Sequence, residues 1–286
     1  DTPVEFDYPD DTSPNGQRNY TYTGSGGVPV GSLLNKAVFA LKYQEQRILL
    51  SNLINKDSKI LFERNPRDRV AKVAPWLTLD GDPYPALVDG KIMWIIDGYT
   101  TSAGYPYARQ TVLSNATADA LTTNSASIAS QRNQSVNYIR NSVKATVDAY
   151  NGTVTLYQWD EKDPVLKTWS KAFPNTVKPK SEISAQLLEH IRYPEDLFRV
   201  QRDILSSYHV KTAEAFYGGQ DFWRVPRDPS TFGANASAQP PYYLTLQMPG
   251  SQKPAFSLTT PFVPRGGREN LSAFAVVNSD PGPDYG

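Results

Sequence analysis

The sequence predicts an α+β fold with a mostly antiparallel sheet of about seven strands and two blocks of helices. Two pairs of β-rich segments are each joined by a dipeptide that ends in glycine, which is typical of hairpins. Three more short β-rich segments, 242–248, 255–263 and 271–278, follow near the C-terminus. The helical patterns are grouped in two blocks and do not alternate regularly with strands, which argues against a doubly wound parallel sheet.

The segment 76–102 contains the first hairpin and organises the rest of the chain. Its arms, 84–88 and 91–97, are joined by Asp89 and Gly90. An Asp-Gly pair predicts a type I′ turn, with positive φ at both residues. The second arm has five consecutive apolar residues, 92–96. We therefore expect this strand in the centre of the sheet, with both of its faces covered.

A second hairpin is predicted for the segments 142–150 and 153–159. Asn151 and Gly152 stand between them and indicate another type I′ turn. Along the first arm, the apolar residues Val143, Ala145 and Val147 alternate with the polar residues Lys144, Thr146 and Asp148. This alternation predicts a strand with one face on the core and the other in water.

Helices are predicted from apolar spacing and from start signals. Segment 31–50 is expected to form one amphipathic helix with an apolar side. That side consists of Leu33, Leu34, Ala37, Val38 and Leu41. Two pairs, Asn65 with Pro66 and Asp163 with Pro164, are typical of helix N-termini. Two more helices are expected to begin at Ser181 and Pro194.

Composition limits the classes of function. The 286 residues suit one domain, 1–286, with polar loops near 113–134 and 227–241. Lysine plus arginine and aspartate plus glutamate both number 29, so the overall charge does not point to nucleic acid or anionic lipid as a partner. The absence of cysteine excludes disulfides, thiolate metal sites and a cysteine nucleophile. No apolar run approaches the roughly 18 residues of a membrane-spanning helix.

The candidate site lies at the ends of the central hairpin. Asp80 and Asp82 precede it, and Asp97 ends its second arm. Three carboxylates with nearby carbonyl oxygens offer the ligands that a hard divalent cation such as Ca²⁺ prefers. Asp-Gly-Asp-Pro is also a favourable turn sequence, so a structural role is the alternative. Together with the neighbouring tyrosines, the predicted ligand-binding residues are Asp80, Asp82, Tyr84, Asp97, Tyr99 and Tyr105.

An enzymatic role has less support in the sequence than a binding role. Two of these acids facing each other across a cleft lined by Tyr and Trp would suit a glycoside hydrolase. His190 and His209 lack the spacing of a zinc site, and no Gly-x-Ser-x-Gly motif marks a serine hydrolase. A divalent cation is therefore the one cofactor that the sequence suggests.

Several long segments closely resemble a family of bacterial membrane proteins, the uncharacterised protein family 0182. They are YTYTGSGGVPVGSLL (20–34), LTLDGDPYPALVDGKIMWIIDGYTTS (77–102), VNYIRNSVKATVDAYNGTVTLYQWD (136–160), HIRYPEDLFRVQRDILSSYHV (190–210), QPPYYLTLQMPG (239–250) and DPGPDYG (280–286). The resemblance implies several N-terminal membrane-spanning helices followed by a large extracytoplasmic region, of which this chain would be part. It thus implies a place at the cell membrane, on the extracytoplasmic side, but no activity, cofactor or catalytic residue.

We therefore interpret the chain as a binding or interaction module at the cell envelope. The expected partners are the remainder of its own membrane-anchored chain and envelope components, with no nucleic acid. A hydrolase that acts through Asp80, Asp82 and Asp97 and a solute-binding module are the alternatives. The terminal segments around Phe6 and Phe274 are expected docking surfaces, because apolar residues there have little reason to face water.

Overall fold

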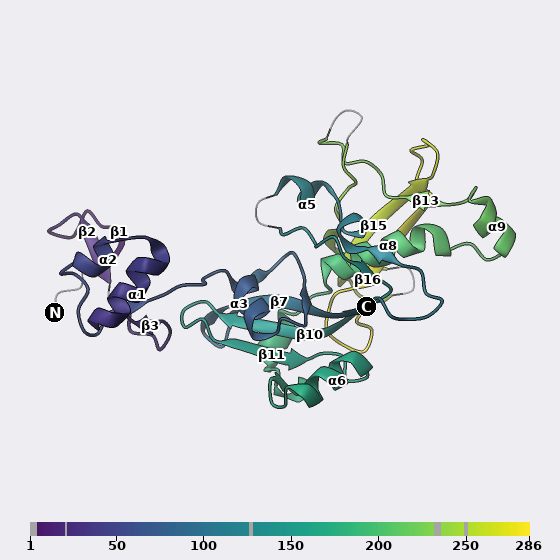
Figure 1. The fold of residues 1–286 in the computed structure, drawn as a ribbon. Helices are drawn as coiled ribbons and strands as arrows, with labels where there is room; N and C mark the ends of the chain where they lie inside the picture. The colour runs from purple at the N-terminus through teal and green to yellow at the C-terminus, as the bar shows by residue number, and fades with distance from the viewer. Residues whose placement is uncertain (1–4, 21, 126–127, 232–235, 249–250) are drawn as a thin grey trace.

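The computed structural model describes residues 5–20, 22–125, 128–231, 236–248 and 251–286. Figure 1 shows a small N-terminal lobe, a central sheet with helices around it, and a C-terminal sheet. Helices and strands are mixed and the sheets are mostly antiparallel, so the α+β prediction is confirmed. None of the described helices is both long and apolar enough to cross a membrane.

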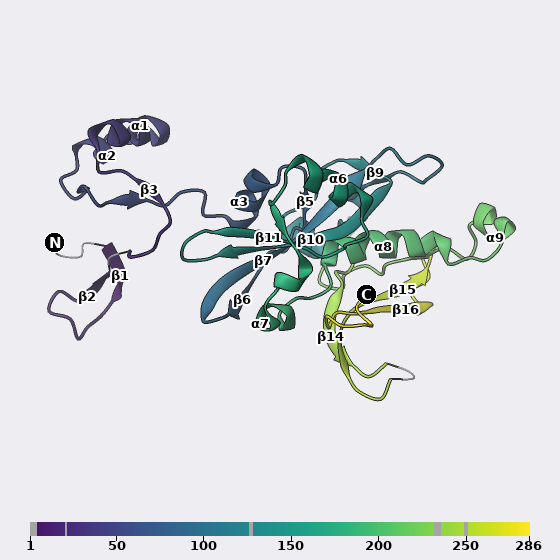
Figure 2. The same cartoon turned by 90° about the horizontal axis from the view of Figure 1, so that it is seen from below.

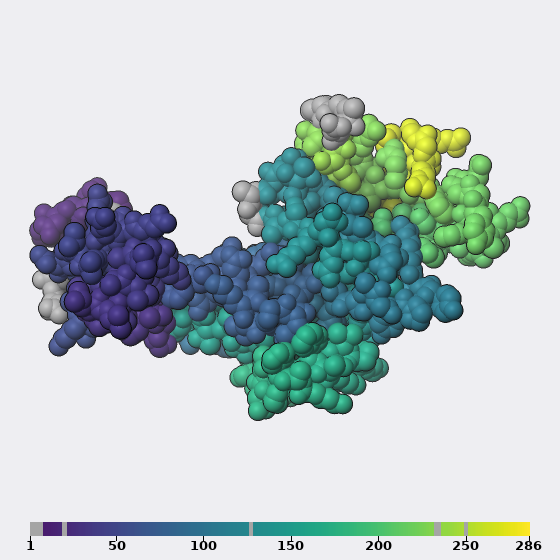
Figure 3. Space-filling model, viewed as in Figure 1, coloured from purple at the N-terminus to yellow at the C-terminus, as the bar shows by residue number. Residues whose placement is uncertain are grey.

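The N-terminal lobe lies at one end of the molecule, beyond a narrow neck (Figure 3). Its elements are β1 (Glu5–Pro9), β2 (Gln17–Tyr20), β3 (Val28–Pro29), α1 (Leu33–Tyr43), α2 (Arg47–Leu50) and β4 (Lys59–Ile60). β1 pairs with β2, and β3 pairs with β4. The lobe contacts the central sheet where the ring of Tyr22 lies 4.9 Å from that of Tyr150 and the N–H of Ser25 donates to the Asn151 side chain.

The predicted helix 31–50 is two helices, and its apolar side does not face the core. α1 ends at Tyr43, because the next residue, Gln44, has a φ of 53°. The N–H of Glu45 closes the helix end by bonding the Ala40 carbonyl at 3.0 Å. Phe39, on the opposite side of the helix, is the buried residue of α1. The leucine side is exposed instead: Leu33, Leu34, Val38 and Leu41. The lobe is too small to cover both sides of this helix.

The central sheet is built on two long antiparallel strands. β7 (Lys91–Ser102) pairs with β10 (Tyr138–Asp148) along nearly their whole length. The strand order is β12-β11-β10-β7-β5, and β6 also pairs with β7. The shorter strands are β5 (Thr78–Leu79), β6 (Tyr84–Val88), β11 (Val154–Gln158) and β12 (Val177–Lys178). β7 is central as predicted, although Ile92 near its start is exposed.

The two predicted hairpins form, but with different turns. Asp89 has a φ of 50° and Gly90 a φ of 75°, as the type I′ prediction requires. In the second hairpin only Gly152, at 72°, has positive φ, so the type I′ prediction is wrong there. The loop is longer, because Asp148 accepts hydrogen bonds from the N–H groups of Tyr150 and Asn151 and thereby holds an extra turn.

The main apolar core lies on one face of the central sheet. α3 (Pro66–Val73) and α6 (Pro164–Ala172) bring Val70 and Leu166 against Ile96 and Leu156. Both helices are capped as predicted, by Asn65 and Asp163 ahead of a proline. On the other face, Ile95 packs with Val88 and with Leu187 of α7 (Ala185–Glu189). The helix expected from Ser181 is a single turn, η1 (Lys180–Glu182), followed by α7.

α8 (Glu195–Tyr208) lies between the central and the C-terminal sheets (Figure 2). Its Phe198 packs against Leu258, and its Val200 packs against Leu113 and Val136. The C-terminal sheet consists of β13 (Trp223–Arg224), β14 (Tyr242–Leu246), β15 (Ala255–Pro264) and β16 (Ala273–Asn278). The remaining elements are β8 (Thr111–Val112), α4 (Leu113–Ala116), α5 (Ala120–Asn124), β9 (Ser135–Val136) and α9 (Ala213–Gly218). The predicted polar loop 113–134 thus contains two short helices.

Candidate functional site

Five of the six predicted site residues belong to one polar cluster between the central sheet and the start of α8. Its members among the predicted residues are Asp80, Asp82, Tyr84, Asp97 and Tyr99, which hydrogen bonds and ion pairs connect with Lys144, Arg192 and Asp196. Tyr105 lies elsewhere, stacked on Tyr138 at 4.8 Å and partly exposed. The structure thus brings five of the predicted residues together and places Tyr105 apart from them.

Asp97 is held by a buried lysine. The Nζ atom of Lys144 lies 2.5 Å from its carboxylate, and both side chains are almost fully buried. Asn141 donates a second hydrogen bond to the same carboxylate at 3.0 Å. Burial raises the pKa of Asp97, and the Lys144 charge opposes this effect. The predicted wet face of β10 is therefore wrong: Lys144, Thr146 and Asp148 are all buried. The Lys144 ammonium is covered by Arg192 and Tyr285, which come from later segments of the chain.

The Asp80 and Asp196 side chains each accept a backbone hydrogen bond from the other's segment. The N–H of Asp196 donates to Asp80 at 3.1 Å, and the N–H of Gly81 donates to Asp196 at 2.9 Å. The Tyr99 hydroxyl donates to Asp80, and burial together with this carboxylate holds the pKa of Tyr99 well above its usual range. Gly81 has no room for a side chain, since a Cβ would lie 2.1 Å from the carbonyl oxygen of Ala129.

The first turn of α8 contains a buried ion-pair network. The Arg199 guanidinium is fully buried and bonds the carboxylates of Asp119, Glu195 and Asp196 at 2.6, 2.9 and 3.0 Å. Arg202 adds a longer contact to Asp119. Burial raises the pKa of Glu195 to about 7, and it also raises the pKa of Asp196, with the charge of Asp80 as a further cause.

Arg192 closes the cluster on its outer side. Its guanidinium lies 2.6 Å from Asp82 and 3.9 Å from the ring centre of Tyr84. Burial raises the pKa of Asp82 in spite of this partner. Each of the three predicted aspartates therefore already has a polar partner: Tyr99, Arg192 and Lys144 for Asp80, Asp82 and Asp97 in turn. Among the described residues, no group of three or more acidic or histidine side chains is arranged to hold a metal ion.

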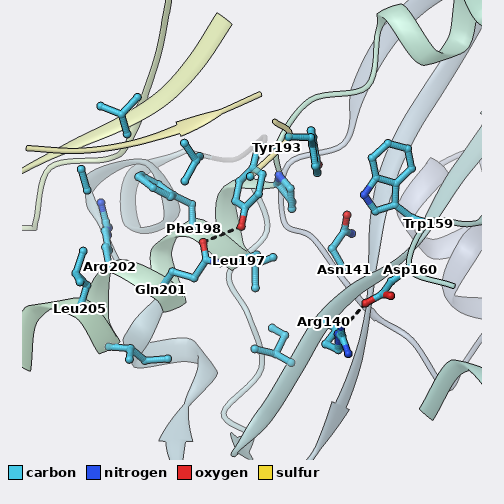
Figure 4. A pocket seen from close by; sticks show the side chains of 18 of the residues that line it. Arg140, Asn141, Trp159, Asp160, Tyr193, Leu197, Phe198, Gln201, Arg202 and Leu205 are labelled. Atoms are coloured by element: carbon cyan, nitrogen blue, oxygen red, sulfur yellow. Dashed lines mark hydrogen bonds and ion pairs between the residues drawn. The ribbon is translucent and has the colours of Figure 1, made fainter. Parts of the chain in front are cut away.

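A cleft of about 970 Å³ lies next to this cluster, between α8, the ends of β10 and β11, and β16. Figure 4 shows its lining, with Tyr193 donating to Gln201 on one side and Arg140 paired with Asp160 on the other. The indole of Trp159 forms part of the wall and meets the ring of Tyr285 edge-on at 5.2 Å. The cleft thus combines aromatic faces with hydrogen-bond donors and acceptors.

The polar cluster and the cleft share a wall. The Lys144 ammonium that bonds Asp97 also bonds the Tyr285 hydroxyl at 3.1 Å and lies 5.1 Å from the ring centre of Trp159. Asn141, which donates to Asp97, lines the cleft as well. Sequence reasoning missed the cleft because its lining comes from separate segments of the chain. The one feature of the sequence that pointed to this region was Lys144, whose position in β10 pairs with Asp97 of β7.

The comparison with known proteins places the chain in a family. The model of the uncharacterised protein family UPF0182 matches residues 1–286. The chain belongs to this family. It is 55% identical over 285 residues to a UPF0182 protein of Streptomyces coelicolor, with 99% of the chain covered. It is 57% identical over 271 residues to one of Thermobifida fusca, with 94% covered.

The chain spans only part of these UPF0182 relatives. It covers 28% of the Streptomyces protein and 26% of the Thermobifida protein. No solved structure matches the chain. The printed names of the relatives state no activity, so the chemistry of the cleft and of the polar cluster has to be inferred from their geometry.

Proposed function

We propose that this UPF0182 region is a binding module on the extracytoplasmic side of a membrane-anchored protein, and that its cleft binds a saccharide of the cell envelope. The location follows from the resemblance described above. The relatives are more than three times as long as this chain, which leaves ample length for a membrane anchor. The remainder of that longer chain would be the permanent partner of this region.

The lining of the cleft is the observation that carries this proposal. The C–H faces of a pyranose ring are apolar and pack on aromatic rings, whereas its hydroxyl groups need donors and acceptors at the edges. Trp159, Tyr193 and Tyr285 supply aromatic surface, and Gln201 and Arg140 supply polar groups. The lining contains both acidic and basic side chains, which favours a neutral or weakly charged ligand over a strongly charged one.

Lys180 occupies the place where a sugar ring would stack. Its ammonium group lies 3.9 Å from the ring centre of Trp159, and the residue is exposed. An exposed lysine chain moves at small cost, because a surface cation–π contact contributes only about 0.5–1 kcal/mol. A ligand would therefore displace Lys180 from the indole, and removal of this side chain should strengthen binding.

The test is isothermal titration calorimetry with N-acetylglucosamine oligomers and with soluble peptidoglycan fragments. We expect Trp159→Ala to abolish binding and Lys180→Ala to strengthen it. Trp169→Ala is the matched control, since Trp169 stacks on Trp76 outside the cleft. Absence of binding by the parent protein at millimolar ligand, or equal binding by the Trp159 variant, would contradict the proposal.

A hydrolase is the second candidate, because burial raises the pKa of Glu195 to about 7, where a carboxylic acid can act as a general acid. Its buried carboxylate is bonded to Arg199, and it is the neighbouring Pro194 and Leu197 that line the cleft, so binding is the leading proposal. Glu195 lies beside the predicted acids Asp80 and Asp82, whose charges raise its pKa further. If the same oligosaccharides were cleaved, and if Glu195→Gln and Asp82→Asn both abolished cleavage, the region would be an enzyme. Binding without cleavage would leave it a binding module.

A further inference from the structure

The N-terminal lobe carries an apolar helix face that the described residues leave uncovered. On α1, Leu33 and Leu34 are each 74% exposed and Leu41 is 82% exposed. Ala37 and Val38 are exposed between them, so the face runs along the length of the helix. Leu50 and Leu53, just beyond α1, are also largely exposed. Isolated exposed leucines are ordinary, but a continuous apolar helix face indicates a surface that binds something.

This face is not needed for the packing of the lobe. Phe39, on the other side of α1, is buried and contacts the rings of Phe62 at 5.9 Å and Tyr43 at 6.2 Å. Lys36 donates to the carbonyl oxygen of Ile54 at 2.8 Å and so ties the helix to the segment after α2. α1 is therefore held in place by its inner side, while its leucine side is free to bind.

The segment that carries this face has an excess of basic residues, whereas residues 5–60 of the lobe as a whole contain six basic and six acidic residues. Residues 28–60, from the start of β3 to the end of β4, contain five basic residues: Lys36, Lys42, Arg47, Lys56 and Lys59. They contain two acidic residues, Glu45 and Asp57, so the local excess is three positive charges. Three of the basic residues already have partners within the lobe: Lys36 and Lys59 donate to backbone carbonyl oxygens, and Lys42 lies 4.4 Å from the ring centre of Phe62. The Arg47 side chain is 93% exposed and lies 4.0 Å from Glu45, which leaves it able to reach another anion.

We propose that the leucine face of α1 lies on an anionic lipid surface. A helix with one aliphatic side and flanking lysine and arginine residues is the form that peripheral proteins insert at the boundary of head groups and acyl chains. Contact sites for proteins are instead enriched in aromatic residues and arginine at their centre, and the centre of this face holds only leucine, valine and alanine. The lobe also lies at one end of the molecule, where a flat surface can reach it (Figure 1).

The test is co-sedimentation of the protein with vesicles of phosphatidylcholine alone and of phosphatidylcholine with phosphatidylglycerol. We expect binding to the mixed vesicles, weaker binding to the neutral ones, and a loss of binding by about tenfold or more in the Leu33→Ser/Leu41→Ser variant. Arg47→Glu should weaken only the binding to mixed vesicles. The matched control is Leu87→Ser/Leu271→Ser, which changes two leucines that are 61% and 66% exposed elsewhere and should bind as the parent does.

A second measurement identifies the part of the chain that enters the lipid. The protein has no cysteine, so Leu34→Cys gives a single position for an environment-sensitive fluorophore. Its emission should shift to the blue with mixed vesicles, whereas the same label at Leu87→Cys should not respond. The proposal is overturned if vesicles bind neither protein nor label, if the serine variant binds equally well, or if light scattering shows a leucine-dependent dimer in place of lipid binding.

Discussion

Lys144 links three separate parts of the molecule through one buried ammonium group. It bonds Asp97 of β7, the backbone carbonyl of Arg192 and the hydroxyl of Tyr285. Lys144→Met should lower the free energy of unfolding by about 3–5 kcal/mol, because Asp97 would be left buried without a cation. Urea denaturation of the variant and the parent measures this loss.

The double variant Lys144→Met/Asp97→Leu provides the control for this ion pair. It removes both charges, so it should be more stable than the single lysine variant. Lys180→Met should be close to the parent, because Lys180 is exposed. A single Lys144 variant as stable as the parent, or a double variant less stable than the single one, would contradict this account of Asp97.

At the scale of elements, α3 and α6 offer a matched pair of helix caps. Asn65 and Asp163 each accept hydrogen bonds from the first turn ahead of a proline. Asn65 does little else, whereas Asp163 is fully buried and also accepts from Thr100 and Ser142. Asn65→Ala should therefore cost about 1 kcal/mol, and Asp163→Ala about 2–4 kcal/mol, because two buried hydroxyl groups lose their acceptor. Equal losses in urea denaturation would contradict the wider role of Asp163.

The first turn of α8 should make stability depend on pH. The pKa of Glu195 is about 7 in the folded protein against 4.5 as its ordinary value, and that of Asp196 is raised as well. Between these values the folded state binds more protons than the unfolded state. Stability from these groups is therefore present at low pH and falls as pH rises through this window, by up to about 1.4 kcal/mol per pH unit for each proton.

Urea denaturation from pH 5 to pH 8 tests this dependence. The charged groups that face Glu195 are Arg199, one turn along α8, together with Arg192, Asp80 and Asp82 from outside the helix. Glu195→Gln should make the free energy of unfolding fall less steeply with pH, since it removes one of the carboxylates whose pKa is raised. A free energy of unfolding that is constant or rises between pH 5 and pH 7 would show that Arg199 keeps both carboxylates ionised.

Elements and turns with local causes could be predicted from the sequence. The caps at Asn65 and Asp163 and the turn at Asp89 and Gly90 depend on neighbouring residues, and all of them form as expected. The acids of the candidate site were found because they flank one hairpin. The burial of Lys144 was missed because its partner Tyr285 is 141 residues away. The exposure of the α1 leucines could not be predicted, because apolar spacing indicates that one side of a helix is buried but does not identify the element that covers it.

At the scale of the whole molecule, the apolar cores and the N-terminal lobe are separate. The four clusters of buried apolar residues in the described chain all begin at or after Val70. Of the expected docking segments at the two ends, Phe274 is 51% exposed, while the side chain of Phe6 lies outside the described residues. Tyr285 is not a free end, since it packs against Tyr193 and Trp159. The C-terminal segment is thus part of the fold, whereas the lobe is joined by a small contact.

The last prediction concerns this division. A fragment of residues 65–286 should fold without the lobe, because it keeps all four apolar clusters, the polar cluster and the cleft. It loses the contacts of Tyr22 with Tyr150 and of Ser25 with Asn151. It also loses the bonds from Arg69 to the carbonyl oxygens of Phe62 and Glu63 and the ion pair of Lys72 with Glu63. We expect a cooperative thermal transition near that of the full chain, with saccharide binding retained and vesicle binding lost. If the fragment has no cooperative transition, the lobe is part of one folding unit and residues 1–286 form the single domain that the sequence predicts.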